Sequence, residues 1–260
     1  MNHWGSEIDF CFTNKSEKNS GKNLTPIVFC GIIEELKDSL FMWKFIIAAL
    51  AVATPVMADP LKDNEFNTMH SMGCMLLREC KEDVNQVFSL LDISNEYPNT
   101  EEYTPYSGEF NKMMTTLNQI GVNVYLADSR YFPVMHRGVY HTVSNNFYLN
   151  KRYMNEPSTL MMLMRHEGWH AAQDCMAGTI DNSLIAIIKP EDEVPMLWRV
   201  MAERTYPSNA VPWEAEAQWA GRTEGMTQKA LEACAGGAMW EVYDPTPLTR
   251  KYLVDFGYIK

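Results

Sequence analysis

The residues best suited to chemistry in this chain form one short stretch, His166-Glu167-Gly168-Trp169-His170. Two histidines four residues apart lie about 40° apart around a helix, so both imidazoles can reach the same metal ion. The glutamate beside the first histidine would project toward a water on that ion, where it can act as a general base. This H-E-x-x-H arrangement predicts a site for one Zn²⁺ ion; the alternative is that the two histidines only pack on the helix.

A catalytic zinc ion usually has three protein ligands and one open position, so a third ligand must lie elsewhere in the chain. The metzincin continuation is excluded, because the places where it needs Gly and His hold Gln173 and Met176. A later segment, Pro212–Gly221, is predicted to be helical and carries two carboxylates, Glu214 and Glu216. Because these lie two residues apart, on nearly opposite sides of the helix, only one of them can face the zinc ion.

The two segments together resemble the gluzincins, zinc metallopeptidases whose third ligand is a glutamate on a later helix. In that family the glutamate is commonly followed, three positions on, by a small residue and then by a short polar one. Glu214, Ala217 and Gln218 fit this pattern, although Asp or Asn is more common than Gln at the last place. The resemblance covers Val139–Gly221 and implies that the substrate is a peptide or a protein.

The side of the predicted helix also favours Glu214 as the ligand. It shares its stripe with the small residues Ala217 and Gly221, which let two helices approach closely. Glu216, the rival, shares its stripe with Trp219 and Ala220. A further alternative is that both carboxylates are solvated, which is the commonest fate of glutamate on a helix.

In this interpretation His166, His170 and Glu214 hold the zinc ion, which lowers the pKa of a water toward about 7. Glu167 is the catalytic base: it takes the proton of that water as the water attacks a carbonyl, and passes it to the leaving amine. The oxyanion needs a stabilising group as well, and several candidates stay open: His136, His141, Tyr153, Tyr206 and Arg222. The first two are also the next ligand candidates if neither glutamate binds zinc.

Three other side chains on the helix that carries H-E-x-x-H can be placed by their angle around its axis. Gln173, seven residues after His166, returns to the ligand side, where it either hydrogen-bonds within the site or is an ordinary polar residue of the cleft. Cys175 lies about 180° from His166, so it is expected to be structural and not a ligand. Trp169 flanks the histidine stripe and is expected in the core.

The N-terminal part of the chain has the layout of a secretory signal that begins at an internal methionine. Residues 42–58 contain one lysine, an apolar run and small residues that end at Ala58, where cleavage is expected. The apolar run is too short to span a bilayer, so no stable membrane span is expected after cleavage. Residues 1–41 are then predicted to be a non-native or disordered extension, and residues 59–260 a single metallopeptidase-like domain in a secreted or periplasmic protein.

Four cysteines remain after such cleavage: Cys74, Cys80, Cys175 and Cys234. An even number in an exported protein predicts two disulfides. Cys74 and Cys80 lie in an apparently helical stretch, where six residues place them about 120° apart, so they are not expected to pair with each other. Each would instead reach one of the two later cysteines. The alternative is four buried thiols in a reducing cell.

The composition excludes some classes of partner. With 22 Lys and Arg against 33 Asp and Glu, the chain carries a net charge of −11 and has no run of cations. Nucleic acid is therefore not expected as a partner, because binding it needs clustered positive charge. A hydrophobic fraction of 46% with 21% charged residues is typical of a globular protein that buries a core.

The predicted elements give a mainly helical α+β fold. Apolar spacing predicts helices over Phe66–Leu91, Phe110–Ile120 and Thr159–Met176, the last with Ser158 as N-cap. Residues rich in β-branched and aromatic side chains predict strands at Val122–Leu126 and within Val139–Leu149. A small sheet is thus expected to pack on the helix that carries H-E-x-x-H, with a later helix supplying the glutamate ligand.

Two other classes of function stay open. One is a secreted zinc-binding or interaction protein without peptidase activity, although a structural zinc site has no use for a base such as Glu167. The other is an all-helical structural protein of the cell envelope, in which His166 and His170 merely pack. The sequence does not indicate an oligomeric state.

Overall fold

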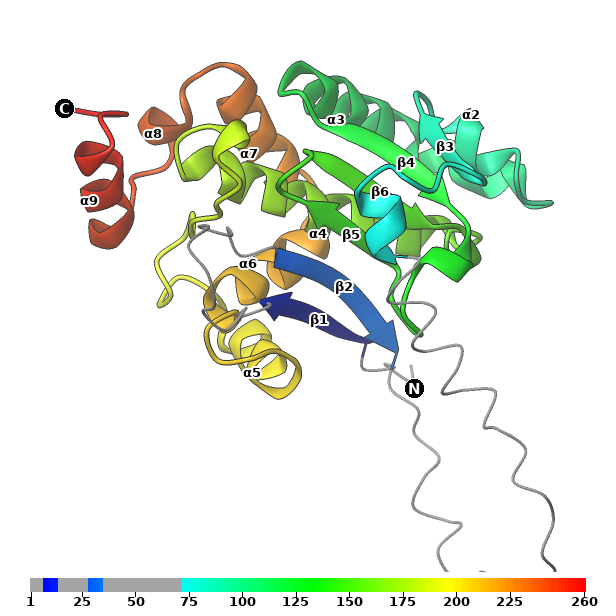
Figure 1. Ribbon diagram of the computed structural model, residues 1–260, viewed down its shortest axis with the longest axis horizontal. Coiled ribbons are helices and arrows are strands. Elements are labelled where there is room, and N and C mark those ends of the chain that lie inside the picture. The colour runs from blue at the N-terminus through cyan, green and yellow to red at the C-terminus, as the bar shows by residue number, and fades with distance from the viewer. Residues whose placement is uncertain (1–6, 14–27, 35–71) are drawn as a thin grey trace, which may run out of the picture.

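The computed structural model describes residues 7–13, 28–34 and 72–260 (Figure 1). The predicted signal segment, residues 42–58, lies outside these ranges. Within residues 1–41 the structure describes two strands, β1 (Glu7–Thr13) and β2 (Val28–Glu34), which pair antiparallel. The proposals that residues 1–41 are an extension and that residues 42–58 are a signal both stay predictions.

A four-stranded mixed sheet supports the site. Its strands are β3 (Val84–Val87), β4 (Asn123–Ala127), β5 (Gly138–His141) and β6 (Asn146–Asn150), in the order β3-β4-β6-β5. The central pair β4 and β6 is parallel, and the two outer pairs are antiparallel. The strands predicted from β-branched and aromatic residues are confirmed as β4 and the hairpin β5–β6.

The longest helix among the described residues, α4 (Pro157–Met176), carries H-E-x-x-H and lies at the centre of the molecule. Fifteen of its residues are buried, because β5 covers it on one side and helices cover it on others. The helix begins one residue before the predicted N-cap, since Pro157 occupies the first turn, where proline fits best. The chain leaves the helix before Gly178, whose φ of 127° suits glycine.

Several of the remaining helices pack against α4, and others lie farther out (Figure 1). Helix α3 (Ser107–Gln119) confirms the second predicted helix, and Gly121 with φ 88° ends it as expected. The longer helices that follow are α5 (Met196–Thr205), α6 (Val211–Gly221), α7 (Met226–Ala235) and α9 (Pro247–Asp255). Short helical turns complete the described chain: α2 (Leu91–Ser94), η1 (Thr100–Tyr106), η2 (Ser129–Tyr131), η3 (Lys151–Tyr153), η4 (Ile180–Asn182) and α8 (Met239–Val242). The structure is therefore mainly helical α+β, as predicted.

The first predicted helix, Phe66–Leu91, is wrong in the part that the structure describes. The helix there covers only residues 72–76, and the chain then turns through Arg78, which has a φ of 60°. A second left-handed residue, Asp83 with φ 56°, leads directly into β3. The apolar spacing that suggested one long helix comes from a short helix, a turn and a strand whose inward residues happen to follow each other.

This turn also overturns the predicted disulfide pairing. The backbone amides of Glu79 and Cys80 both donate to the carbonyl of Cys74, at 2.9 and 3.1 Å, and bring the two cysteines to a Cα separation of 5.2 Å. Cys74 pairs with Cys80, and Cys175 pairs with Cys234 at a Cα separation of 6.0 Å. The predicted number of two disulfides is thus confirmed, and so is the structural role of Cys175. The predicted pairing is wrong, because it assumes that Cys74 and Cys80 lie on one continuous helix, whereas the helix ends between them.

Candidate metal centre

Helices α4 and α6 bring His166, His170 and Glu214 together. The two imidazole Nε2 atoms lie 3.2 Å apart, and each lies 3.7 Å from a carboxylate oxygen of Glu214. All three side chains are buried, and their ligand atoms lie within 4.8 Å of one another. This group could hold a metal ion, and it is the set of residues expected from the sequence.

The close packing of the two helices depends on Gly221. A Cβ atom at this position would lie 3.2 Å from the carbonyl oxygen of Met162 and 3.3 Å from Cβ of His166. Both distances are tighter than ordinary contacts, so a larger residue would push α6 away from α4. The stripe of small residues noted in the sequence is therefore what lets Glu214 reach the two histidines.

One hydrogen-bonded amide orients His170. The Nδ1 atom of His170 lies 2.8 Å from Oε1 of Gln173, whose Nε2 donates to Glu216 at 2.8 Å and to the carbonyl of Trp213 at 3.1 Å. Because the amide nitrogen of Gln173 is engaged with two acceptors, its oxygen faces the imidazole, and Nδ1 must carry the proton. The lone pair of His170 then lies on Nε2, toward Glu214. This confirms the expectation that Gln173 hydrogen-bonds within the site.

His166 is held in its neutral form. Burial lowers its pKa well below the ordinary value, and the nearby His170 and the positive charge of Arg222 lower it further. A hydrogen bond to the backbone of Ala217 acts in the opposite direction, so the ring donates to that residue. A neutral imidazole is the form that binds a metal ion.

Glu216, the rival ligand, points away from the histidines and is fully buried. Its carboxylate accepts hydrogen bonds from the indole Nε1 of Trp169 at 3.0 Å and from Nε2 of Gln173. It also accepts from the backbone amides of Ile188 at 3.1 Å and Lys189 at 2.6 Å. Burial raises its pKa to about 7, although these four donors act in the opposite direction. The alternative that both glutamates are solvated is wrong, because α6 is buried on both of these sides.

Glu167, the expected base, is buried beside His166, and a hydrogen bond from the sheet holds its carboxylate. Its Oε2 accepts a hydrogen bond of 2.9 Å from the backbone amide of Tyr140 in β5. The hydroxyl of Tyr140 donates to Asp174 at 3.0 Å. Burial raises the pKa of Asp174 to about 9. The strand β5 therefore contacts both the candidate base and a buried acid two turns further along the same side of α4, an acid that sequence reasoning missed.

The residues considered for the oxyanion lie in different places. His141 ends β5, directly after Tyr140, and Nδ1 of His141 lies 2.7 Å from the hydroxyl of Ser144. Arg222 follows α6, close enough for its charge to act on His166. His136 precedes β5 at the opposite end, and burial lowers the pKa of both His136 and His141 to about 4. Among the described residues neither histidine belongs to the group that could hold the metal.

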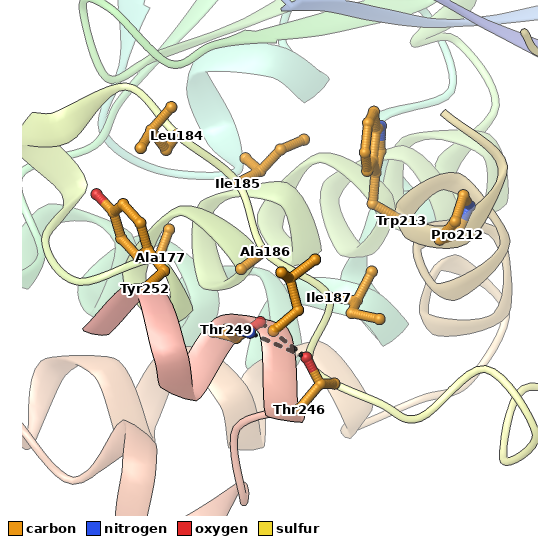
Figure 2. A pocket seen from close by; sticks show the side chains of 11 residues that line it. Ala177, Leu184, Ile185, Ala186, Ile187, Pro212, Trp213, Thr246, Thr249 and Tyr252 are labelled. Atoms are coloured by element: carbon orange, nitrogen blue, oxygen red, sulfur yellow. Dashed lines mark hydrogen bonds between the residues drawn. The ribbon is translucent and has the colours of Figure 1, made fainter. Parts of the chain in front are cut away.

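An apolar cavity of about 460 Å³ lies at the C-terminal end of α4 (Figure 2). Its walls come from the segment after η4, the start of α6 and helix α9, and the lining includes Ile185, Ile187, Trp213 and Tyr252. The cavity and the metal centre share part of their framework, since Trp213 precedes Glu214 and its carbonyl accepts from Gln173. The backbone amide of Ala186 in the cavity wall also donates to the carbonyl of Gln173, at 3.0 Å.

Two glutamines near the ligands differ in their hydrogen bonds. Gln218, at the place where the gluzincin pattern has a short polar residue, is buried, and neither of its side-chain polar atoms hydrogen-bonds to another group in the described part of the chain. Gln173, on the same helix as the histidines, orients His170 instead.

Comparisons of the chain with family models, with curated proteins and with solved structures found no match.

Proposed function

We propose that this protein is a zinc-dependent metallopeptidase that hydrolyses peptide bonds. One observation carries the proposal: two imidazole nitrogens and a carboxylate converge in the interior, next to a second carboxylate, Glu167, in H-E-x-x-H spacing. Nitrogen and oxygen donors of this kind suit zinc, and three protein ligands leave one position open for chemistry.

The distances in the group support zinc as the ion. Ligand atoms that each lie 2.0–2.1 Å from a tetrahedral zinc ion lie about 3.3 Å from one another. The two imidazole nitrogens lie 3.2 Å apart, close to this value. Each lies 3.7 Å from a different oxygen of Glu214, and with one oxygen taken from the carboxylate the three ligand atoms lie within 4.8 Å of one another. Small movements of the side chains would therefore complete the coordination, without rearrangement of α4 or α6.

The proposed reaction assigns separate tasks to the residues of the chain. A zinc ion held by His166, His170 and Glu214 would polarise a substrate carbonyl and lower the pKa of a water. Glu167 accepts the proton from the attacking water and donates it to the leaving amine. The backbone amide of Tyr140 holds one oxygen of the Glu167 carboxylate and so restricts the rotation of this side chain.

Two measurements test this function together. The purified protein is expected to hold one zinc ion per chain, and to cleave unstructured peptide substrates. Glu167→Gln should retain zinc but lose activity by about 10²- to 10⁴-fold, because the amide cannot accept the proton. Zinc binding without any peptidase activity would favour the other candidate, a zinc-binding protein, and absence of zinc would refute the metal centre.

We also propose that the protein is secreted or periplasmic. Two disulfides are typical of proteins in oxidising compartments. Among the described residues no helix is long and apolar enough to cross a membrane. The N-terminal sequence of the natural protein tests this proposal: it should begin near Asp59, and a start before Met42 would contradict it.

A further inference from the structure

Glu216 and Gln173 form a chain of hydrogen bonds that ends on one of the metal-binding histidines. Glu216 accepts from Gln173 at 2.8 Å, and Gln173 lies 2.8 Å from Nδ1 of His170. We infer that Glu216 is a positioning residue for the metal centre: it fixes the amide of Gln173, and the amide fixes the tautomer of His170. This inference rests on the proposed function, because it gives the tautomer a role in zinc binding.

The direction of each hydrogen bond follows from the chemistry of its partners. A carboxylate can only accept, so the group that Gln173 presents to Glu216 must be its NH₂. The carbonyl of Trp213 is a second acceptor for the same NH₂, at 3.1 Å. The amide oxygen therefore has to face His170, and only an Nδ1–H can donate to it. A neutral imidazole with its proton on Nδ1 presents the lone pair of Nε2 for a metal ion.

The position of Glu216 is itself firmly determined. Besides Gln173, its carboxylate accepts from the indole of Trp169 and from two consecutive backbone amides, those of Ile188 and Lys189. These donors come from α4 and from the segment that precedes α5, so the carboxylate connects three parts of the chain. An amide held by such an anchor cannot rotate without breaking several hydrogen bonds at once.

A glutamine flip would have the opposite effect on the metal centre. With its NH₂ turned toward His170, Gln173 would require a lone pair on Nδ1, and the proton would move to Nε2. That nitrogen would then donate to Glu214 instead of binding an ion. The carboxylate of Glu216 prevents this flip, since it would oppose the amide oxygen of Gln173 with a second acceptor.

Zinc affinity is the first test. Gln173→Ala and Glu216→Gln are each expected to weaken zinc binding about 10- to 100-fold, the usual effect of removing an outer partner of a ligand. If Glu216 acts through Gln173, the double variant should lose no more affinity than the larger single loss. Affinities are measured by competition with a chromophoric chelator on the full chain. Additive losses, or unchanged affinity in folded Gln173→Ala, would overturn the inference.

Thr227→Val is the matched control. The Thr227 hydroxyl is buried and donates to the carbonyl of Arg165 at 2.7 Å, on another side of α4. This variant removes one buried hydrogen bond from the same helix without touching the ligands, so its zinc affinity should stay within a factor of two or so of the unchanged chain. A loss as large as that of Gln173→Ala would show that any damage to α4 weakens the site.

The tautomer of His170 gives a readout that does not depend on zinc or on activity. In the zinc-free protein, nitrogen NMR of the imidazoles should find the His170 proton on Nδ1, and Gln173→Ala should produce a mixture of tautomers. Gln173→Ala leaves Glu216 with three donors, so this variant remains informative even if Glu216→Gln does not fold. A proton on Nε2 of His170 in the unchanged chain would refute the relay. A protein that binds no zinc but has the Nδ1 tautomer would refute only the proposed function.

Discussion

Helix α6 carries two buried carboxylates two residues apart, and they differ in what surrounds them. Glu216 accepts four hydrogen bonds, all from protein donors. Glu214 faces the Nε2 atoms of two imidazoles, His166 and His170, each 3.7 Å from one of its oxygens. Both side chains are equally buried, so burial alone does not distinguish a structural carboxylate from a ligand. The donors around each carboxylate make the distinction.

The energetics of burial explain why this difference matters. A carboxylate removed from water loses a large hydration free energy, which must be offset by donors or by a positive charge. The protein supplies donors to Glu216, and these connect α4, α6 and the segment before α5. Beside Glu214 it places the Nε2 atoms of two histidines, 3.2 Å from each other, and a cation bound between these atoms and the carboxylate would offset the cost of burying the charge. The first arrangement suits a framework and the second suits a metal site.

The largest expected effect is the loss of zinc affinity when the carboxylate of Glu214 is removed. Glu214→Ala leaves two histidines for the ion, so zinc affinity should fall well beyond the 10- to 100-fold typical of outer partners, and activity should disappear with it. The zinc content of dialysed protein measures this. If Glu216→Ala loses the zinc ion while Glu214→Ala retains it, then Glu216 is the ligand and Glu214 is the structural carboxylate.

Loss of the Glu216 carboxylate should lower the stability of the fold. Glu216→Ala leaves three donors without their acceptor, the indole of Trp169 and the backbone amides of Ile188 and Lys189, whereas Gln173 keeps the carbonyl of Trp213. An unsatisfied buried donor costs about 1–3 kcal/mol, and the Lys189 bond is only partly buried, so a loss of about 3–5 kcal/mol in the free energy of unfolding is expected. Denaturant unfolding of the zinc-free protein measures it. Glu203, exposed on α5, is the matched control, and Glu203→Ala should change stability by less than about 0.5 kcal/mol. A similar small change for Glu216→Ala would show that its hydrogen bonds are not structural.

The sequence predicted the surroundings of Glu214 better than those of Glu216. The spacing of His166 and His170, and the small residues that share a stripe with Glu214, are local properties of helices and can be derived from angles. The four donors to Glu216 come from segments far away in the chain, two of them backbone amides, which have no sequence signature. From the sequence alone, Glu216 is only a rival ligand, with solvation of both glutamates as the alternative.

The same limit explains the error in the disulfides. The predicted helix over residues 66–91 was inferred from apolar spacing, and this spacing cannot detect that the chain turns at Arg78 with a positive φ. Once the helix ends, Cys80 returns to Cys74 and the angular argument no longer applies. By contrast, α3, β4 and α4 were predicted nearly to their bounds, because glycine and proline mark their ends.

Asp174 extends the comparison to a third buried acid, one for which a single donor, Tyr140, is seen at its carboxylate. Its pKa is raised to about 9, compared with about 7 for Glu216, which has four donors. A carboxyl that stays protonated in the folded chain and ionises near 3.8 in the unfolded chain binds more protons when folded. Its contribution to stability is therefore complete below about pH 4 and is lost as the pH rises toward 9.

Asp174→Asn tests this pH dependence, since asparagine resembles the protonated acid and does not titrate. Between pH 5 and pH 8 the free energy of unfolding of the unchanged chain should fall relative to that of the variant, by up to about 1.4 kcal/mol per pH unit. Urea unfolding of both proteins without zinc, at several pH values, measures the difference and removes the pH dependence of metal binding. Parallel curves for the two proteins would mean that Asp174 is ionised in the folded chain. In that case the number of protein donors would not decide which buried carboxylates keep their charge.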